Sequence, residues 1–357
     1  MSNVRIAVVG CGYWGQNLLR NFCDLEEAEV ITVCDFDSRA LVRAKRRYPT
    51  VEVTQSYAEV LKNSRVDAVV LATPVSTHHP FAKQALQAGK HVLVEKPLAQ
   101  STTQVLDLIE LAERKSKTVM VDHTFLYTGA VRRMKSLVES GEIGQLLYFD
   151  SVRINLGLVQ SDISVLWDLA PHDFSIMDYL CEQEPIAISA TGVKHLNTPH
   201  ENVAYVTVQC EGNFIAHFHL NWLAPVKVRR TLIGGSKKMI VYDDVEGSEK
   251  VKVYDKGIVQ ERDPERREKM LTGYRNGDML APQLETTEAL RLMAREFVNS
   301  ILEKRAPLSD GHAGYRVVRL LEAAQRSIEE NGRVIVLREA QPPMRGMSAT
   351  STIAAAD

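Results

Sequence analysis

The first third of the chain alternates short apolar runs with segments of helical periodicity, and this alternation constrains the fold more than any other feature. The runs VRIAVVG (residues 4–10) and EVITVCD (29–35), for example, are followed by amphipathic stretches at 14–23 and 38–47. Strands that alternate with helices build βαβ units, which form a parallel sheet covered on both faces. We therefore predict a doubly wound α/β domain. Further strands are expected at 51–54, 67–74, 91–97 and 118–122, and further helices at 57–63, 78–89 and 101–115.

The pattern changes near residue 124, where helices at 128–140 and 165–181 are followed by a series of alternating apolar and polar runs. Turn sequences such as EGN and GGSKK join these runs, which is typical of an antiparallel sheet with one helix-covered face. We predict an α+β domain with a large, mainly antiparallel sheet. A charged stretch at 262–278 should separate this sheet from two helices at 286–304 and 310–330. The expected strands are 185–193, 202–210, 214–223, 228–234, 238–242 and 250–255.

The composition excludes several classes of function. With 43 basic and 45 acidic residues the net charge is -2, so we expect no general attraction to nucleic acid or to an anionic membrane. No apolar run approaches the roughly 20 residues of a membrane span, and the N-terminus lacks a signal-peptide layout. The five cysteines are scattered without a C-x-x-C spacing, which fits reduced thiols. We therefore expect a cytoplasmic protein without a metal site.

A glycine motif follows the first expected strand. Gly10, Gly12 and Gly15 form G-x-G-x-x-G at the start of a helix, where a pyrophosphate can approach the helix N-terminal amides. Asp35 ends the next strand, 20 residues after Gly15, where a carboxylate can bind the adenosine ribose. The motif predicts a Rossmann domain that binds NAD.

Two alternatives remain for this motif. The glycines could simply form a turn, with Asp35 capping the helix that starts near Ser38. Arg39 could instead meet the 2'-phosphate of NADP, although a solvated first-turn arginine is the simpler explanation. Since Asp35 would repel that phosphate, we expect NAD. Tyr13 and Trp14, which lie inside the same motif, are included in the expected cofactor site.

These patterns divide the chain into three parts. Residues 1–123 are expected to form the dinucleotide-binding domain and residues 124–340 an α+β domain for substrate binding and oligomerisation. The helices near the C-terminus could pack back on the first domain. The second-domain sheet has more apolar positions than one helix layer can cover, which predicts a homo-oligomer formed sheet to sheet. Residues 341–357 are small, polar and proline-marked, and we expect them to be disordered.

The apolar run HVLVEKP (91–97) ends in a lysine and a proline. Proline cannot donate to a strand ladder, so the pair closes the strand. Strand ends at the carboxyl edge of a parallel sheet border the cofactor crevice, so Lys96 should point toward the nicotinamide. Its ammonium could there stabilise a substrate oxygen during hydride transfer. A surface lysine at a strand end is the alternative.

The sequence VLWDLAPHDFSIMDYL places Asp168 and His172 four residues apart, on one face of the expected helix. A carboxylate that orients an imidazole is a common base arrangement. If the helix begins here, its dipole favours a neutral His172 that can accept a hydroxyl proton. Asp168 could alternatively be a helix N-cap, and His172 could be a core histidine with satisfied hydrogen bonds.

These motifs together resemble the Gfo/Idh/MocA family of oxidoreductases. The resemblance runs through VVGCGYWG, VCDFD, ATPVSTHH, AGKHVLVEKPLA and WDLAPHD. It implies that Lys96 is the catalytic lysine, in a cis peptide bond with Pro97, and that His172 is the acid/base with Asp168 as its partner. It also implies a cofactor site with contributions from Thr73, Pro74, His78, Glu95 and Lys96. His79 is the alternative to His78.

Within the family, the segments RINLG, NWLAPVKVRRTLIGG and MIVYDD resemble members that act on nucleotide-linked sugars in surface-polysaccharide biosynthesis. This implies that Arg153, Asn155, Lys227 and Arg229 meet the sugar or its diphosphate, beside Lys96, Asp168 and His172. A charged sheet edge that discourages aggregation would explain Lys227, Arg229 and the adjacent Arg230 equally well.

The sequence thus predicts an NAD-dependent dehydrogenase acting on CH–OH groups. Its expected substrate is C3 of a UDP-N-acetylhexosaminuronate, as in UDP-N-acetylglucosaminuronate 3-dehydrogenases, or of a related nucleotide sugar. One alternative is a dehydrogenase of free inositol or free sugars, which needs no diphosphate site. Another is a non-catalytic NAD-binding sensor, against which intact Lys96, Asp168 and His172 argue.

Overall fold

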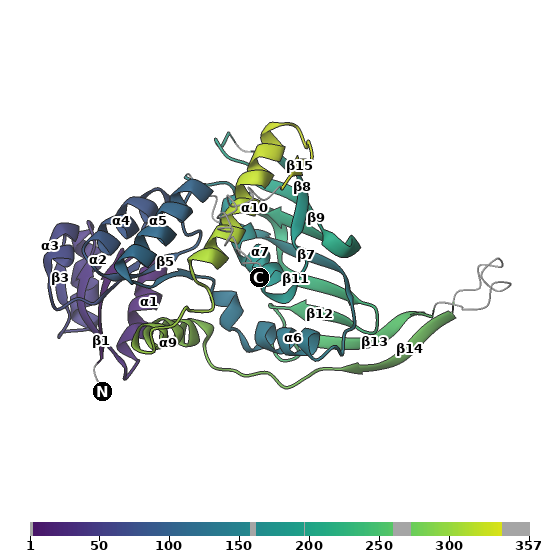
Figure 1. Ribbon diagram of the computed structural model, residues 1–357, viewed down its shortest axis with the longest axis horizontal. Helices are drawn as coiled ribbons and strands as arrows, with labels where there is room; N and C mark the ends of the chain where they lie inside the picture. Colours follow the sequence, from purple (N-terminus) through teal and green to yellow (C-terminus); the bar gives the residue numbers. More distant parts are fainter. Residues whose placement is uncertain (1–2, 158–161, 196, 260–272, 338–357) are drawn as a thin grey trace, which may run out of the picture.

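The first part of the chain forms a six-stranded parallel sheet with the strand order β3-β2-β1-β4-β5-β6 (Figure 1). The computed structural model describes residues 3–157, 162–195, 197–259 and 273–337. Neighbouring strand residues are buried on opposite faces: Ala7 belongs to one apolar core and Val8 to another. The prediction of a doubly wound sheet is confirmed.

The strands of this sheet are β1 (Val4–Val9), β2 (Ala28–Cys34), β3 (Glu52–Thr54), β4 (Ala68–Leu71), β5 (His91–Glu95) and β6 (Val119–Asp122). Its helices are α1 (Tyr13–Cys23), α2 (Ser38–Arg47), α3 (Tyr57–Lys62), α4 (Val75–Gln87) and α5 (Thr102–Lys115).

A nine-stranded sheet follows, in the order β14-β13-β12-β11-β7-β10-β9-β8-β15. Its pairs are antiparallel except β7 with β10, so the predicted mainly antiparallel sheet is also confirmed. The strands are β7 (Leu146–Leu156), β8 (Pro185–Val193), β9 (Val203–Cys210), β10 (Ile215–Asn221), β11 (Leu223–Gly235), β12 (Met239–Asp243), β13 (Val251–Val259), β14 (Gly273–Leu280) and β15 (Ile335–Val336).

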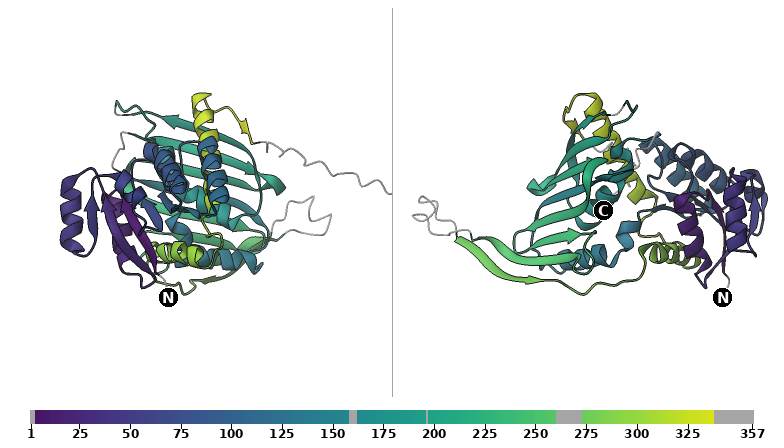
Figure 2. Two further views of the ribbon diagram at one scale, coloured as in Figure 1. Left: turned by 60° about the vertical axis from the view of Figure 1, so that its left-hand side comes forward. Right: turned by 180° about the vertical axis from the view of Figure 1, so that it is seen from behind.

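Three of these strands differ from expectation, among them the two-residue β15, which was not predicted. The central strand β7 was not predicted, because Asp150 and Arg153 interrupt its apolar pattern. The charged stretch at 262–278 was expected only to separate elements, yet part of it forms β14, which is almost entirely exposed and so has no apolar face to reveal it. Together β13 and β14 form a ribbon that extends away from the body of the molecule (Figures 1 and 2).

Helices connect the two sheets. The helices are α6 (Gly129–Glu139), α7 (Val165–Leu180), α9 (Ala289–Leu302) and α10 (Gly311–Glu329), with 3-10 turns at Thr124–Tyr127 and Glu211–Asn213. Helix α9 packs against α1, where Phe22 and Phe297 meet edge to face at 6.4 Å. Helix α10 contacts β8 and α7 as well as α5 and β6 (Figure 2). The last two helices thus pack against elements of the first sheet.

Helix α7 carries the Asp168–His172 pair. Its N-cap is Ser164, whose hydroxyl accepts the Trp167 amide at 3.4 Å, so Asp168 lies within the first turn and is not the cap. Asp173, the residue after His172, is buried and binds Arg153 of β7 through two oxygens, the shortest contact being 2.7 Å. A buried charge is stable only when paired, so this ion pair fixes α7 on the sheet.

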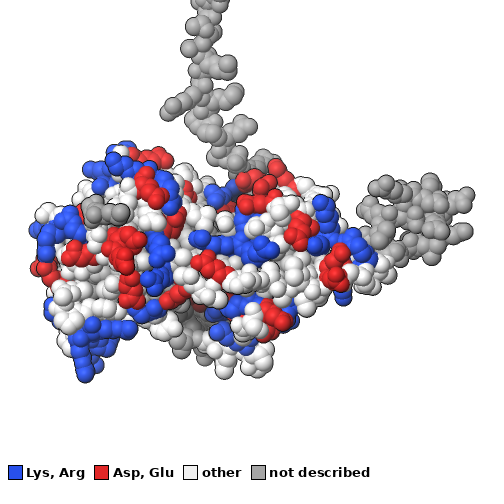
Figure 3. All heavy atoms as spheres, turned by 90° about the horizontal axis from the view of Figure 1, so that it is seen from below, with Lys and Arg blue, Asp and Glu red and all other residues white. Residues whose placement is uncertain are grey.

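The surface is mixed in charge. On the face seen in Figure 3, lysine and arginine side chains are interspersed with aspartate and glutamate. Among the described residues, no helix has the length and apolar character needed to cross a membrane. The predicted tail at 341–357 lies outside the described residues.

Candidate active site

The expected cofactor residues gather at the carboxyl edge of the parallel sheet. Gly10 follows β1, Asp35 follows β2, Thr73 follows β4 and Lys96 follows β5. Helix α7, which packs on the second sheet, lies at this edge. The direct hydrogen bonds from Lys96 to Asp168 show the contact. Residues from both parts of the chain therefore build one site.

The three positions of the glycine motif require glycine for different reasons. Gly10 has a φ of +88°, and a Cβ on it would collide with the Ala72 carbonyl, while a Cβ on Gly15 would collide with the Gly10 carbonyl. A Cβ on Gly12 would meet no protein atom within 4 Å. Packing thus explains Gly10 and Gly15, whereas Gly12 leaves open space where a pyrophosphate can approach the backbone. These residues fit a dinucleotide.

The first turn of α1 is open to a ligand. Its N-cap, Gly12, supplies no side-chain hydrogen bond, so the turn keeps free amides and the positive end of the helix dipole. Tyr13 and Trp14 flank it, 77% and 47% exposed, with their rings edge to face. Asp35 accepts the Cys11 amide at 2.5 Å, which holds this carboxylate against the glycine turn.

Asp35 makes a second local contact, since its other oxygen accepts the Asp37 amide at 2.8 Å. Carboxylate oxygens have further lone pairs, so Asp35 can still accept ribose hydroxyls. Arg39, the alternative ligand for a 2'-phosphate, is exposed in the first turn of α2, and its amide bonds Asp37, the N-cap.

Thr73 and Pro74 lie at the sheet edge, but His78 lies beneath it. The His78 ring is 1% exposed and bridges two loops, with Nδ1 at 2.8 Å from the Pro97 carbonyl and Nε2 at 2.8 Å from the Thr73 carbonyl. Burial lowers the pKa of His78. His79 is engaged elsewhere, 2.7 Å from Asp107. The structure therefore gives His78 a role in holding the loops that carry Thr73 and Lys96.

Lys96 and Asp168 form the contact at the centre of the site. The Lys96–Pro97 bond is cis. The Lys96 ammonium donates to the Asp168 carbonyl at 2.7 Å and to its carboxylate at 2.9 Å. The Trp222 indole donates to the other carboxylate oxygen at 3.3 Å. Asp168 is therefore paired with Lys96 rather than hydrogen-bonded to His172 as expected, because a partly buried ammonium needs an anion more than a neutral ring does.

His172 lies beside this pair in an apolar and cationic setting. Its ring packs on Phe125 at 5.0 Å, and its buried Nδ1 has no hydrogen-bond partner among the described residues. Burial, followed by the nearby Lys96, Arg153 and Arg229, holds the pKa of His172 well below its usual range. This setting favours the neutral imidazole, which has a ring nitrogen that can accept a proton.

The four residues expected to bind substrate are placed differently from one another. Arg153 is 5% exposed and committed to Asp173, so its guanidinium is not open to a ligand. Arg229, its partner in the β7–β11 register, binds Asp244 at 3.2 Å. Asn155 is half-buried near Gly157, and Lys227 is exposed.

A buried carboxyl pair lies under Lys96, and sequence reasoning missed it. Glu95 and Asp122 are neighbours in the β5–β6 register, both nearly inaccessible, and Glu95 Oε1 and Asp122 Oδ2 have no hydrogen-bond partner in the described structure. Burial raises the pKa of Glu95 well above its usual range and that of Asp122 to about 6. Burial therefore favours the protonated form of these two carboxyl groups. Glu95 was expected at the cofactor but is buried at the end of β5. The sequence signal for the pair is that two neighbouring strands each end in an acidic residue.

Two family models match this chain. The first is described as an oxidoreductase family with an NAD-binding Rossmann fold and matches residues 4–123. The second is the GFO/IDH/MocA C-terminal domain and matches residues 131–241. Together they cover more than half of the chain. The protein is thus a two-domain oxidoreductase-family protein with an NAD-binding Rossmann domain. It belongs to the Gfo/Idh/MocA family.

The individual relatives and solved structures described next share about a quarter to a third of their aligned residues with this chain. Glycosyl hydrolase family 109 protein 2 of Shewanella sp. (strain ANA-3) is 32% identical over 43% of this chain, but the match spans only 36% of that relative's length. The dTDP-3,4-didehydro-2,6-dideoxy-alpha-D-glucose 3-reductase of Saccharopolyspora spinosa is 28% identical over 72% of this chain and 81% of its own. The structure of GenD2 from gentamicin A biosynthesis, in complex with NAD, superposes with a TM-score of 0.80 at 23% identity, covering 95% of this chain and 97% of GenD2.

The glycine turn offers a matched pair of variants. Gly12→Ala should leave stability unchanged, because its φ of -70° suits alanine and the Cβ meets no protein atom, but should weaken NAD binding at least tenfold. Gly15→Ala should destabilise the fold by about 1–3 kcal/mol through overpacking. Calorimetric titration with NAD and denaturant unfolding measure both effects. Equal NAD affinity for Gly12→Ala and wild type would contradict the assignment.

The carboxyl pair predicts a pH-dependent stability. A raised pKa in the folded state means that stability falls as pH rises from about 4 to about 6, because Asp122 ionises in the unfolded chain while the folded protein still holds its proton. Asp122→Asn keeps an oxygen for the Thr124 hydroxyl and removes this cost. The difference in unfolding free energy between Asp122→Asn and wild type should therefore change by about 2–3 kcal/mol in favour of the variant between pH 4 and pH 6.

The control for this measurement is Asp24→Asn at an exposed position. Its pH profile of unfolding should run parallel to that of the wild type. If the Asp122→Asn profile is parallel as well, the buried pair does not titrate as described.

Proposed function

We propose that the protein is an NAD-dependent oxidoreductase that transfers hydride between the nicotinamide and a secondary alcohol of a sugar. The observation that carries this proposal is the Lys96–Asp168 contact beside a neutral His172, at the edge where Gly12 leaves room for the cofactor. Gly12, Asp35 and Thr73 would hold the dinucleotide. When bound, its nicotinamide supplies the hydride acceptor or donor.

The side chains divide the proton chemistry between them. His172 accepts the hydroxyl proton during oxidation, because burial keeps the ring neutral. The Lys96 ammonium has three N–H groups and gives two hydrogen bonds to Asp168, which leaves one for the substrate oxygen. Asp168 holds the ammonium in a fixed direction, so that it can stabilise negative charge on that oxygen.

The finer proposal is a nucleotide-linked sugar that reacts at C3, in particular a UDP-N-acetylhexosaminuronate. The relative in Saccharopolyspora spinosa, whose name describes a dTDP-sugar 3-reductase, supports this class. Lys227 and Arg229 of β11 would meet the anionic groups of such a substrate. Arg153 acts instead by holding α7 through Asp173. A free sugar or inositol remains the alternative substrate.

Two variants test the catalytic roles. Lys96→Ala and His172→Ala should each lower kcat by about 10²- to 10⁴-fold, because each removes a group that acts on the proton or the oxygen in the transition state. The assay follows absorbance of reduced nicotinamide with NAD and a panel of UDP-sugars, inositol and free sugars. Lys62→Ala, at an exposed position in α3, is the control.

Each outcome of this assay has a meaning. Turnover of inositol without turnover of any nucleotide sugar would overturn the substrate class. Full biological function in a Lys96→Ala, His172→Ala double variant would instead favour a non-catalytic NAD sensor.

We also propose that the protein forms a homo-oligomer through the open face of the nine-stranded sheet. Inward-facing residues of β9 and β10 are buried, whereas Ile186, Tyr205 and Ile215 are 43%, 44% and 45% exposed. The Tyr205 ring stacks on His219 at 4.6 Å, which adds aromatic surface to this face. Light scattering should give a multiple of the 40.0 kDa chain mass. A monomer would contradict this proposal.

A further inference from the structure

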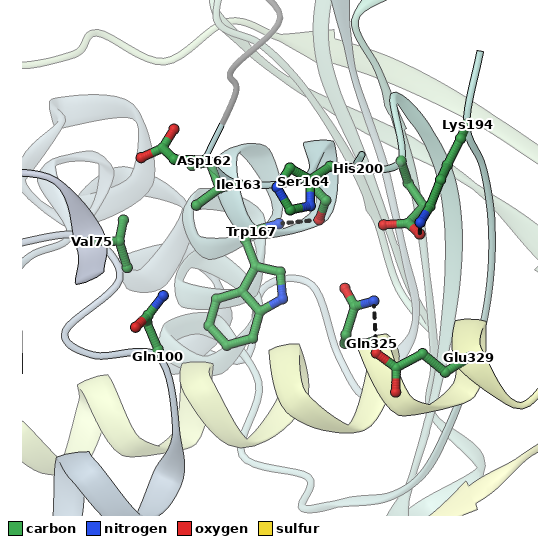
Figure 4. A pocket seen from close by; sticks show the side chains of 11 residues that line it. Val75, Gln100, Asp162, Ile163, Ser164, Trp167, Lys194, His200, Gln325 and Glu329 are labelled. Carbon is green, nitrogen blue, oxygen red and sulfur yellow. Dashed lines mark hydrogen bonds and ion pairs between the residues drawn. The ribbon is translucent and has the colours of Figure 1, made fainter. Parts of the chain in front are cut away.

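A cavity of about 360 Å³ lies between the two sheets, next to the candidate active site (Figure 4). Val75 after β4 and Gln100 after β5 form one wall, and α10 contributes Gln325 and Glu329 to the other. Trp167, the residue before Asp168, projects between these walls (Figure 4). A cavity of this size falls in the range of small-ligand sites, which is about 300–1,000 Å³.

The lining combines an aromatic face with acidic groups. Asp162, Glu201 and Glu329 supply three carboxylates, and Lys194 is the one lysine or arginine among the described lining residues. The Gln325 amide donates to Glu329 at 3.3 Å and is thereby oriented. Such a lining repels a phosphate or a carboxylate. It favours a group that donates hydrogen bonds and has a flat apolar face.

Glu201 gives an independent indication of a ligand. It is 6% exposed, yet its carboxylate accepts no hydrogen bond from the described residues, and the Lys194 ammonium lies 3.6 Å away. The Lys194 ion pair offsets part of the cost of burying this charge, and the lone pairs that it leaves free can accept hydrogen bonds from a ligand. Sugar hydroxyl or ammonium groups are donors of the required kind.

We propose that this cavity is a sugar subsite that binds the hydroxyl- or amino-bearing edge of the substrate pyranose, stacked on Trp167 and hydrogen-bonded to Glu201. The proposal rests on the proposed sugar oxidoreductase function and adds an orientation to it. Along the nine-stranded sheet, Arg229 lies on β11 at one side of the Asp168–Trp222 contact, and Glu201 lies before β9 at the other. An anionic part of the substrate would face the first side and a hydroxyl-rich or amino-bearing part the second.

Saccharide binding without turnover tests the subsite. The probes are methyl N-acetylglucosaminide, glucosamine and inorganic phosphate, titrated calorimetrically into the full chain with saturating NAD. We expect the two sugars to bind and phosphate to bind at least tenfold more weakly. Glu201→Gln, which keeps the shape of the side chain, should weaken glucosamine binding about tenfold, as expected for loss of a charged hydrogen bond.

The controls separate binding from folding. Glu211→Gln, at an exposed position in the second 3-10 turn, should bind like wild type. Trp167→Leu should weaken both sugars, and thermal unfolding shows whether it folds. If Trp167→Leu does not fold, Glu201→Gln alone decides.

Two results would overturn the subsite: equal glucosamine affinity for Glu201→Gln and wild type, or competition between the sugars and NAD, which would make the cavity part of the cofactor site. The proposed function fails separately. Sugars that bind as expected while no sugar is turned over would leave the subsite standing and remove the enzymatic assignment.

Discussion

The candidate site depends on one ion pair between the two parts of the chain. Lys96 ends a strand of the parallel sheet, and Asp168 lies in a helix packed on the other sheet, 72 residues away. The side chains are 11% and 21% exposed, so water screens the pair only in part. The pair brings β5 and α7 together. Because the ammonium bonds both a carbonyl and a carboxylate of Asp168, its direction is fixed as well as its position.

That pair can work only if α7 itself is held in register on the sheet. The N-terminus of α7 is fixed by Ser164, and the middle of the helix by the buried Arg153–Asp173 pair. Phe125 fills the space between Arg153 and His172, with the guanidinium 4.6 Å from the ring centroid. Asp168 and His172 are therefore placed by the second sheet, whereas the expected cofactor edge is placed by the first.

Features that depend on local spacing were predictable from sequence. The glycine turn, Asp35 and the Asp168–His172 separation follow from neighbouring positions, and the structure places them where the patterns indicated. The ion-pair partners of the charged side chains could not be predicted from the sequence, because these pairs join residues that are far apart along the chain. Arg153 is an example: it was expected at the substrate and is bound to Asp173. The signal was present, since Asp173 shares a helix face with the buried Ala170 and Met177, and an acid there requires a buried cation.

The charges around His172 set its strength as a base. Lys96, Arg153 and Arg229 all lower the pKa of His172, and each is paired with a carboxylate: Asp168, Asp173 and Asp244. The ring thus lies among three neutralised cations and has no anion of its own.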